Sequence, residues 1–390
     1  MNGFVSKLKK VKWKHFVNYI AIGIAAALFT LLSIGGALPL TTLLLLEKIT
    51  MNITLAVSLS LVVGFLGELS LGHAGFMCIG AYLGGKMSVL LMEAGIEEGK
   101  GILSFVIALV VGAAVAGVFG FIIGLPALRL KGDYLAIVTL AFGEIVKTVF
   151  ENSSVESFGG PTGLKTPRFD NQYLFIIGFV LVLLTVFIIQ NLIRSKHGRA
   201  ITAIRDNEIA ARATGINVTK YKLVGFIISS AIAGAAGVFY SFANYNVKAS
   251  VFDYNYSIEI LIMVVLGGMG NITGAIISAT AITFINTQLQ TMLKGDLAVL
   301  KDILYSLILV LIIIYNNAPG LKFFREKYNV HNLVDFIKHK VLKIQKNPAA
   351  DKDDEGAWHR VPTKIEMNEV LSVDLKVVES TMTPDKEDKS

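Results

Sequence analysis

A polar interval between two apolar stretches decides the fold: residues 194–222 read RSKHGRAITAIRDNEIAARATGINVTKYK. Only Asp206 and Glu208 are acidic there, against Lys or Arg at positions 194, 196, 199, 205, 212, 220 and 222. The flanking stretches are continuously apolar over about 20 residues, the length that crosses a membrane. The interval is therefore a loop between two spans. Its cations place it in the cytoplasm, because Lys and Arg are retained on that side during insertion.

The same interval predicts a helix. Residues 199–214 contain no Pro or Gly, and Gly198 and Gly215 bracket them, so a continuous helix of about four turns is expected. Glu208 precedes Arg212 by four residues, the favourable order for an exposed ion pair. Two interpretations remain open. The helix is a solvated connector, or it lies on the membrane surface and docks into a cytoplasmic partner.

Composition indicates an all-α, polytopic integral membrane protein. Of the 390 residues, 54% are hydrophobic, and the mean hydropathy is +0.63. We expect about 8–10 transmembrane helices, including Gly-broken or re-entrant segments. A β-barrel is excluded because its strands would alternate apolar and polar residues. The net charge of +7 gathers at the N-terminus and the loops, where it reports membrane topology and not binding of nucleic acid.

Charge and hydropathy divide the chain into three parts. Residues 1–15 carry five lysines and no acidic residue, and we expect them to be a cytoplasmic N-terminus. Residues 16–320 form the transmembrane domain, which contains the loop 194–222 and ends with a span from about residue 300 to 315. Residues 321–390 are predicted to be a cytoplasmic tail, partly disordered because of its charged and polar composition.

The first break between apolar segments is GELSLGHAG at residues 67–75. Glu68, Ser70 and His73 lie in or beside this Gly-rich joint. Charged groups at membrane depth are costly and usually face protein or water, and broken helices are tolerated there only where the freed backbone is buried or lines a cavity. The joint is either an interrupted helix beside a translocation pathway or a tight turn at the membrane surface.

A second break lies in residues 257–283, where Gly and polar residues interrupt the apolar sequence from Gly267 to Gly274. Asn271 and Thr273 lie inside this break, and Glu259 lies near the start of the segment. Corresponding interruptions in the two halves of a transporter indicate its pathway. The alternative is a chance similarity between two turns built from small residues.

Glu144 is another charged residue in an apolar segment, within residues 134–150. Lys147 follows it by three residues, so the two side chains are expected to pair on one face of a helix. Glu144 either contributes to the pathway or marks the outer end of a span.

Four strings carry a resemblance to a known family. They are GELSLGHAGFMCIGAY from residue 67, LRLKGDYLAIVTLAFGEI from residue 128, AIRDNEIAARATGINVTKYKL from residue 203 and SIEILIMVVLGGMG from residue 257. In this order they resemble the branched-chain amino acid ABC transporter permeases, in particular the longer of the two permease subunits. The resemblance covers residues 62–319 and implies that the loop helix 199–215 couples to an ATPase. It implies that Glu208, Ala210, Ala211 and Gly215, with Arg205 beside them, form the coupling site.

The resemblance also implies that the chain works in a bacterial plasma membrane, as one subunit of a larger importer. A second homologous permease subunit, two cytoplasmic ABC ATPase subunits and an extracytoplasmic amino-acid-binding protein are the expected partners, together with membrane lipid. The solutes would be leucine, isoleucine and valine. ATP and Mg would be used by the ATPase subunits, and this chain would be a transport subunit and not an enzyme.

Other functions remain as alternatives. Permeases for urea or short amides carry similar motifs, and an ATPase-independent channel or secondary transporter is a further possibility. No GxxxxGK[ST] phosphate loop is present, and Cys78 is the only cysteine, so a cofactor or metal bound by this chain is not expected. A membrane-embedded enzyme would need a convergent set of catalytic groups, and the sequence offers none.

Overall fold

A computed structural model describes residues 17–36, 38–95, 101–130, 132–167 and 174–292, together with residues 306, 307 and 310. The predicted N-terminal part, residues 1–15, and the predicted tail, residues 321–390, lie outside these residues. So does nearly all of the predicted last span.

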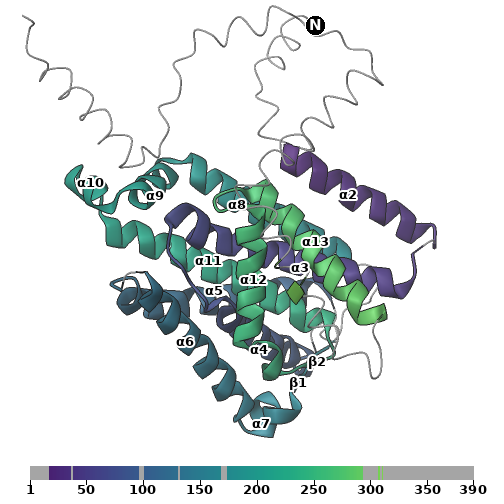
Figure 1. Cartoon of the computed structure of the whole chain (residues 1–390). Coiled ribbons are helices and arrows are strands. Elements are labelled where there is room, and N and C mark those ends of the chain that lie inside the picture. The colour runs from purple at the N-terminus through teal and green to yellow at the C-terminus, as the bar shows by residue number, and fades with distance from the viewer. Residues whose placement is uncertain are drawn as a thin grey trace, which may run out of the picture. The chain divides into compact units, whose positions relative to one another are not determined.

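Helices dominate the described chain (Figure 1). In chain order they are α2 (Val17–Ile34), α3 (Leu40–Ser60), which continues as the π-helical turn η2 (Leu61–Leu66), α4 (His73–Glu93), α5 (Ile102–Ala127), α6 (Asp133–Glu151), α7 (Val155–Phe158), α8 (Leu174–Arg194), α9 (Lys196–Asp206), α10 (Glu208–Ala213), α11 (Val218–Ala243), α12 (Tyr254–Gly267) and α13 (Ile272–Met292). The other elements are the 3-10 turns η4 (Gly160–Thr162) and η5 (Ala249–Val251) and the antiparallel strands β1 (Leu164–Lys165) and β2 (Asn246–Val247).

Seven of the described helical segments are long and apolar enough to cross a membrane. They are Leu40–Leu66, His73–Glu93, Ile102–Ala127, Leu174–Arg194, Val218–Ala243, Ala249–Gly267 and Ile272–Met292. The prediction of an all-α, multi-pass membrane protein is confirmed. Helix α6 is not among the seven, and it carries Asp133, Glu144, Lys147 and Glu151.

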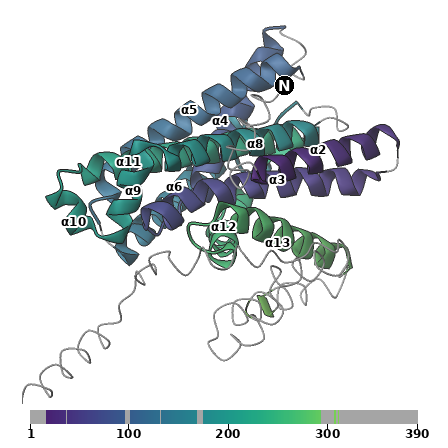
Figure 2. The same cartoon turned by 90° about the horizontal axis from the view of Figure 1, so that it is seen from above.

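Helix α11 is central to the packing, because it contacts α5, α4 and α3 (Figure 2). Small residues let these backbones approach closely, as is typical of membrane helices. A Cβ atom added to Gly80 of α4 would lie 2.0 Å from the carbonyl oxygen of Gly234 in α11. One added to Gly237 would lie 2.0 Å from the carbonyl oxygen of Met77. The α4–α11 contact therefore depends on glycine from both helices.

Helix α3 forms the other side of the bundle. It packs along α13 and α8 and also contacts α12, and from Ile49 to Ser60 every side chain is buried. Helix α12 runs across the long helices in Figure 1 and links the α6 side of the bundle to α13. Polar residues that α3 and α13 present to each other can therefore meet well inside the protein.

The predicted continuous helix over residues 199–214 is wrong, because the loop holds two helices, α9 and α10, separated at Asn207. Asn207 is extended, with φ −158° and ψ 105°, and its Oδ1 accepts a hydrogen bond from the backbone N–H of Ala210 at 3.0 Å. Asn competes for backbone hydrogen bonds and so favours helix N-caps over helix interiors. The bracketing Gly215 follows α10 and adopts φ +84°, where the chain turns.

Candidate functional site

Helices α9 and α10 lie at one end of the long helices (Figures 1 and 2), here named the loop end. Arg205, in the last turn of α9, reaches from there to the end of η2. Its Nη1 donates a hydrogen bond to the carbonyl oxygen of Gly64 at 3.1 Å. The last carbonyl groups of a helix have no partner within the helix. Arg205, from the loop, supplies the hydrogen-bond partner of the Gly64 carbonyl group.

The end of η2, just before the first Gly-broken joint, contacts the second joint beside Arg205. A Cβ atom added to Gly64 would lie 2.3 Å from the backbone nitrogen of Gly270. A Cβ atom added to Gly67 would lie 2.8 Å from Cγ of Arg205, and one added to Gly270 would lie 3.3 Å from Nη1 of Arg205. The first break, the second break and the loop helix α9 therefore form one contact, here named the joint contact.

Lys222 connects the first joint to α10. Its Nζ forms an ion pair with Glu68 and a second one with Glu208 at 3.1 Å. Glu208 also accepts from Arg212 at 2.9 Å, as the sequence predicts. The Lys222 side chain is only 5% exposed. One buried cation thus holds a carboxylate from the joint and a carboxylate from the loop helix.

The exposed surface of α10 is apolar at its most prominent point. Ile209 is 81% exposed, and Ala210, Arg212 and Gly215 are also exposed. Ala211 is buried among Ile204 and Val218. The structure thus places Ala210 and Gly215, but not Ala211, where a partner could contact them. Ile209 is a surface residue that the sequence reasoning did not single out.

The predicted pathway residues do not form one site. Glu68 lies in the ion pairs at the loop end, whereas His73 is buried with its Nε2 2.7 Å from Oγ of Ser58. Glu144 pairs with Lys147 at 3.2 Å, as predicted, and accepts from the backbone N–H of Tyr254. Ser70 is buried within the first joint.

The two predicted residues of the second break also lie apart from the others. Asn271 accepts a hydrogen bond from the backbone N–H of Gly274, and Thr273 donates one to Asn18. Among the predicted pathway residues, Glu259 alone lines the large polar cavity between the helices.

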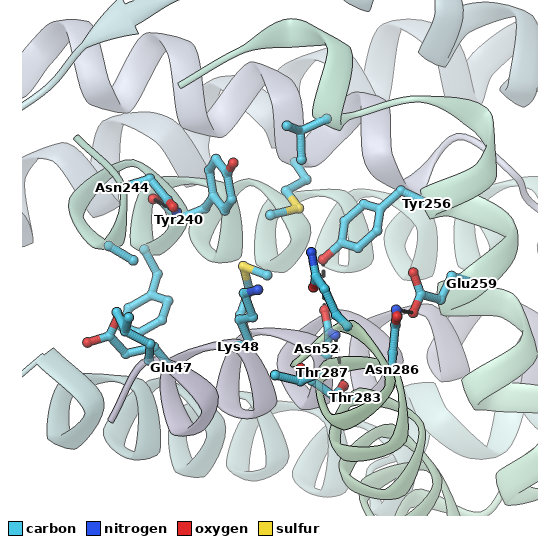
Figure 3. A pocket seen from close by; sticks show the side chains of 17 residues that line it. Glu47, Lys48, Asn52, Tyr240, Asn244, Tyr256, Glu259, Thr283, Asn286 and Thr287 are labelled. Atoms are coloured by element: carbon cyan, nitrogen blue, oxygen red, sulfur yellow. Dashed lines mark hydrogen bonds between the residues drawn. The ribbon is translucent and has the colours of Figure 1, made fainter. Parts of the chain in front are cut away.

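A cavity of about 600 Å³ lies between α3, α4, α11, α12 and α13 (Figure 3). Its polar lining comprises Glu47, Lys48, Asn52, Tyr240, Asn244, Tyr256, Glu259, Thr283, Asn286, Thr287 and Gln290. Its apolar lining includes Leu44, Met51, Met77 and Phe239. The volume lies in the range of about 300–1,000 Å³ that is typical of small-molecule sites. We name it the polar cavity.

Hydrogen bonds between helices fix the walls of the polar cavity. Asn52 on α3 donates from Nδ2 to Oγ1 of Thr283 on α13 at 2.8 Å. Tyr256 on α12 donates from its hydroxyl to Oδ1 of Asn52 at 2.7 Å. Asn286 donates to Oε1 of Glu259 at 3.0 Å. These three bonds join α3, α12 and α13 to one another around the cavity.

The sequence reasoning missed most of this cavity, although it contained a usable signal. Glu47 and Lys48 are adjacent charged residues inside a segment that is otherwise suited to crossing a membrane. Ionisable residues in such segments usually mark a functional site. Asn52, one turn further, would have extended the signal along α3. No group of three or more His, Cys, Asp or Glu within the described ranges could hold a metal ion.

Replacement of Arg205 by Gln is expected to loosen the joint contact. A hydrogen bond to a charged group contributes about 1.5–3 kcal/mol, and partial solvent exposure of Arg205 places the expected loss near the lower value, about 1.5 kcal/mol. Thermal unfolding of the purified protein measures this. Arg199→Gln is the control, because Arg199 is an exposed cation on the same helix. Equal melting temperatures for the two variants would contradict the role given to Arg205.

The long apolar helices, the polar loop helices and the cavity among the spans define a multi-pass α-helical membrane transport protein. The model of the family described as branched-chain amino acid transport system / permease component matches residues 41–313. The chain belongs to this family.

Three relatives show the range of the similarity. The high-affinity branched-chain amino acid transport system permease protein LivM of Escherichia coli (strain K12) is 34% identical over 301 residues, which cover 69% of this chain and 67% of the relative. LivH of the same system is 24% identical over 282 residues, 67% of this chain and 87% of LivH. The ribose import permease protein RbsC of the same strain is 27% identical over 297 residues, 70% and 84% of the two chains. No solved structure gives a significant match.

Proposed function

We propose that this chain is a transmembrane permease subunit of an ATP-driven importer that moves leucine, isoleucine and valine into the cell. The observation that carries the proposal is the exposed surface of α10, which ion pairs through Lys222 tie to the joint between α3 and α4. A displacement of α10 by a partner would reach the spans through these contacts. The family and the similarity to LivM support the solute class.

The proposed assembly contains more than this chain. The similarity to both LivM and LivH supports pairing with a second, homologous permease subunit. Two cytoplasmic ABC ATPase subunits would bind ATP and Mg and hydrolyse the nucleotide, and an extracytoplasmic binding protein would deliver the solute. This chain would contribute the pathway, without a cofactor of its own and without catalysis.

The loop end faces the cytoplasm in this proposal, and the membrane is a bacterial plasma membrane. The support is the excess of Lys and Arg in residues 194–222, because such loops stay on the cytoplasmic side. Both chain termini would lie on the same side. They fall outside the described residues, so their location stays a prediction from the sequence.

Ile209→Asp is expected to abolish ATP-driven leucine uptake while leaving this subunit stable. Burial of an Ile side chain contributes about 1.5–3 kcal/mol, so a charge in its place weakens docking of an ATPase by tenfold or more, or about 1.4 kcal/mol per factor of ten. Ile209 is 81% exposed, so the replacement disturbs little within the chain. Co-purification of the ATPase subunits and uptake by reconstituted vesicles measure the effect.

Ile209→Leu is the matched control, because it keeps an apolar side chain at the same place. Normal uptake and normal ATPase retention in Ile209→Asp would contradict the coupling role of α10. Glu208→Lys is a weaker probe, because it also breaks the ion pair with Lys222 inside the chain.

A further inference from the structure

The polar cavity holds a cation where a cation is costly. Lys48 lies in the segment Leu40–Leu66, which is long and apolar enough to span a membrane. Figure 3 shows its side chain projecting from α3 into the cavity. Within the part of the chain that the structure describes, Lys48 has no ion pair and no hydrogen bond from its side chain. Ionisable residues inside spans are rare and mark solute or ion pathways.

Two carboxylates line the cavity, Glu47 on α3 itself and Glu259 on another helix. Glu259 projects from α12 toward the same cavity (Figure 3), and Asn286 of α13 holds its Oε1 at 3.0 Å. A carboxylate has about four acceptor sites on its two oxygens, so it can accept further hydrogen bonds while Asn286 keeps it in place. Tyr256 and Asn52 lie between the two charges in Figure 3.

The remaining wall suits an aliphatic group. Leu44, Met51, Met77 and Phe239 all line the cavity. Methionine side chains are flexible and adapt to apolar ligands of different shape. A cation, a carboxylate and an apolar wall together match the three parts of a zwitterionic aliphatic amino acid. A neutral solute such as urea would leave the Lys48 ammonium group without a counterpart.

The cavity is also far from the loop end. Lys48 precedes Gly64 by 16 residues along α3 and η2, which is about 24 Å at the rise of an α-helix. In the proposed orientation the cavity therefore lies toward the extracytoplasmic side, where a binding protein releases its solute.

We propose that the polar cavity is the amino-acid-binding site of this subunit, in which Lys48 binds the solute carboxylate, Glu259 binds the solute ammonium group and Met51, Met77 and Phe239 contact the aliphatic side chain. The proposal rests on the proposed importer function and adds the residues that recognise the solute. Each charged group of the solute is assigned to one side chain, so variants that change the charge of Lys48 or Glu259 test the proposal.

The test uses the complete transporter, purified with its partners and reconstituted in vesicles, and a reporter cysteine at Thr287 in the cavity wall. The chain's own Cys78 is fully buried, so Thr287→Cys supplies the reactive thiol of this chain. Labelling of that thiol by a water-soluble reagent is followed by mass spectrometry of this chain. Leucine is expected to slow labelling. Leucinamide lacks the carboxylate and 4-methylpentanoate lacks the ammonium group. Neither compound is expected to slow labelling.

Charge variants then assign the contacts. Lys48→Met in the reporter background is expected to raise the leucine concentration for half-protection by about tenfold or more, because a hydrogen bond from a charged group to the solute is lost. Lys48→Arg keeps the charge and is expected to keep most of the protection. Glu259→Gln is expected to weaken leucine protection while retaining hydrogen-bonding capacity. Thr291→Cys is the matched control, because this exposed threonine lies one turn further along α13 and does not line the cavity.

Two outcomes would overturn the inference. If leucinamide protects Thr287→Cys from labelling as strongly as leucine does, the proposed contact between Lys48 and the solute carboxylate is excluded. This test holds even if Lys48→Met fails to assemble. Unchanged leucine protection in an assembled Lys48→Met variant would exclude Lys48 as the carboxylate partner. A failure of the importer function is distinguishable, because the unmodified complex would then show no ATP-driven leucine uptake at all.

Discussion

Lys222→Met is expected to abolish ATP-driven uptake and to destabilise the protein. The Lys222 ammonium group holds Glu68 and Glu208 together at the loop end. Without it, two carboxylates from different elements face each other in a mostly buried place. Removal of one partner of a buried ion pair costs about 3 kcal/mol or more, which is a factor of about one hundred in an equilibrium. Uptake by vesicles and thermal unfolding of the purified protein measure both effects.

Two further variants separate this effect from a general loss of charge. Lys220→Met removes an exposed cation two residues earlier and is expected to change the melting temperature little. The double variant Lys222→Met with Glu68→Gln is expected to be more stable than Lys222→Met alone. Glutamine at position 68 removes the buried carboxylate that Lys222→Met leaves without its cation, so the two effects are not additive. If the changes in melting temperature caused by Lys222→Met alone and by Glu68→Gln alone add up to the change in the double variant, the ion pair does not connect the joint to α10.

Gly80→Val is expected to prevent stable packing of α4 on α11. Even the first added carbon atom would lie 2.0 Å from the carbonyl oxygen of Gly234, and a backbone contact cannot be relieved by a change of rotamer. Overpacking costs typically about 1–3 kcal/mol and occasionally more, and we expect about 3 kcal/mol or more here because both sides of the contact are backbone. The amount of monodisperse protein extracted from membranes and its melting temperature measure the loss.

Gly117 provides the matched control on α5. A Cβ atom added there would meet Ala231 at an ordinary 3.5 Å, so Gly117→Ala is expected to fold normally, whereas Gly80→Ala is expected to lower the melting temperature. Equal stability of the two alanine variants would show that the α4–α11 contact is looser than the structure describes.

Local sequence patterns predicted much of the fold. Length and apolarity are properties of a single segment, so the spans could be recognised one by one. The ion pairs Glu208–Arg212 and Glu144–Lys147 lie within one helix each, so their spacing was sufficient. The same reasoning failed at Asn207, where a helix interior and an N-cap are both compatible with the local sequence and the cap prevailed.

Contacts between distant segments could not be predicted in this way. Glu68 and Lys222 are 154 residues apart, and nothing in either local pattern names the other. The polar cavity draws its lining from five helices, α3, α4, α11, α12 and α13, and its size depends on how those helices pack. The prediction that the two Gly-broken joints are related did not depend on a contact, yet Gly67 of the first joint and Gly270 of the second both lie against Arg205. Their part in a translocation pathway stays a prediction.

The measurement that tests the central claim most directly is solute uptake by vesicles that contain this chain together with the proteins that co-purify with it from native membranes. The account predicts recovery of a second permease and two ATPase subunits, with leucine accumulation that requires ATP, Mg and a loaded binding protein. Recovery of this chain alone, with leucine uptake that needs no ATP, would contradict the account and would indicate a channel or a secondary transporter.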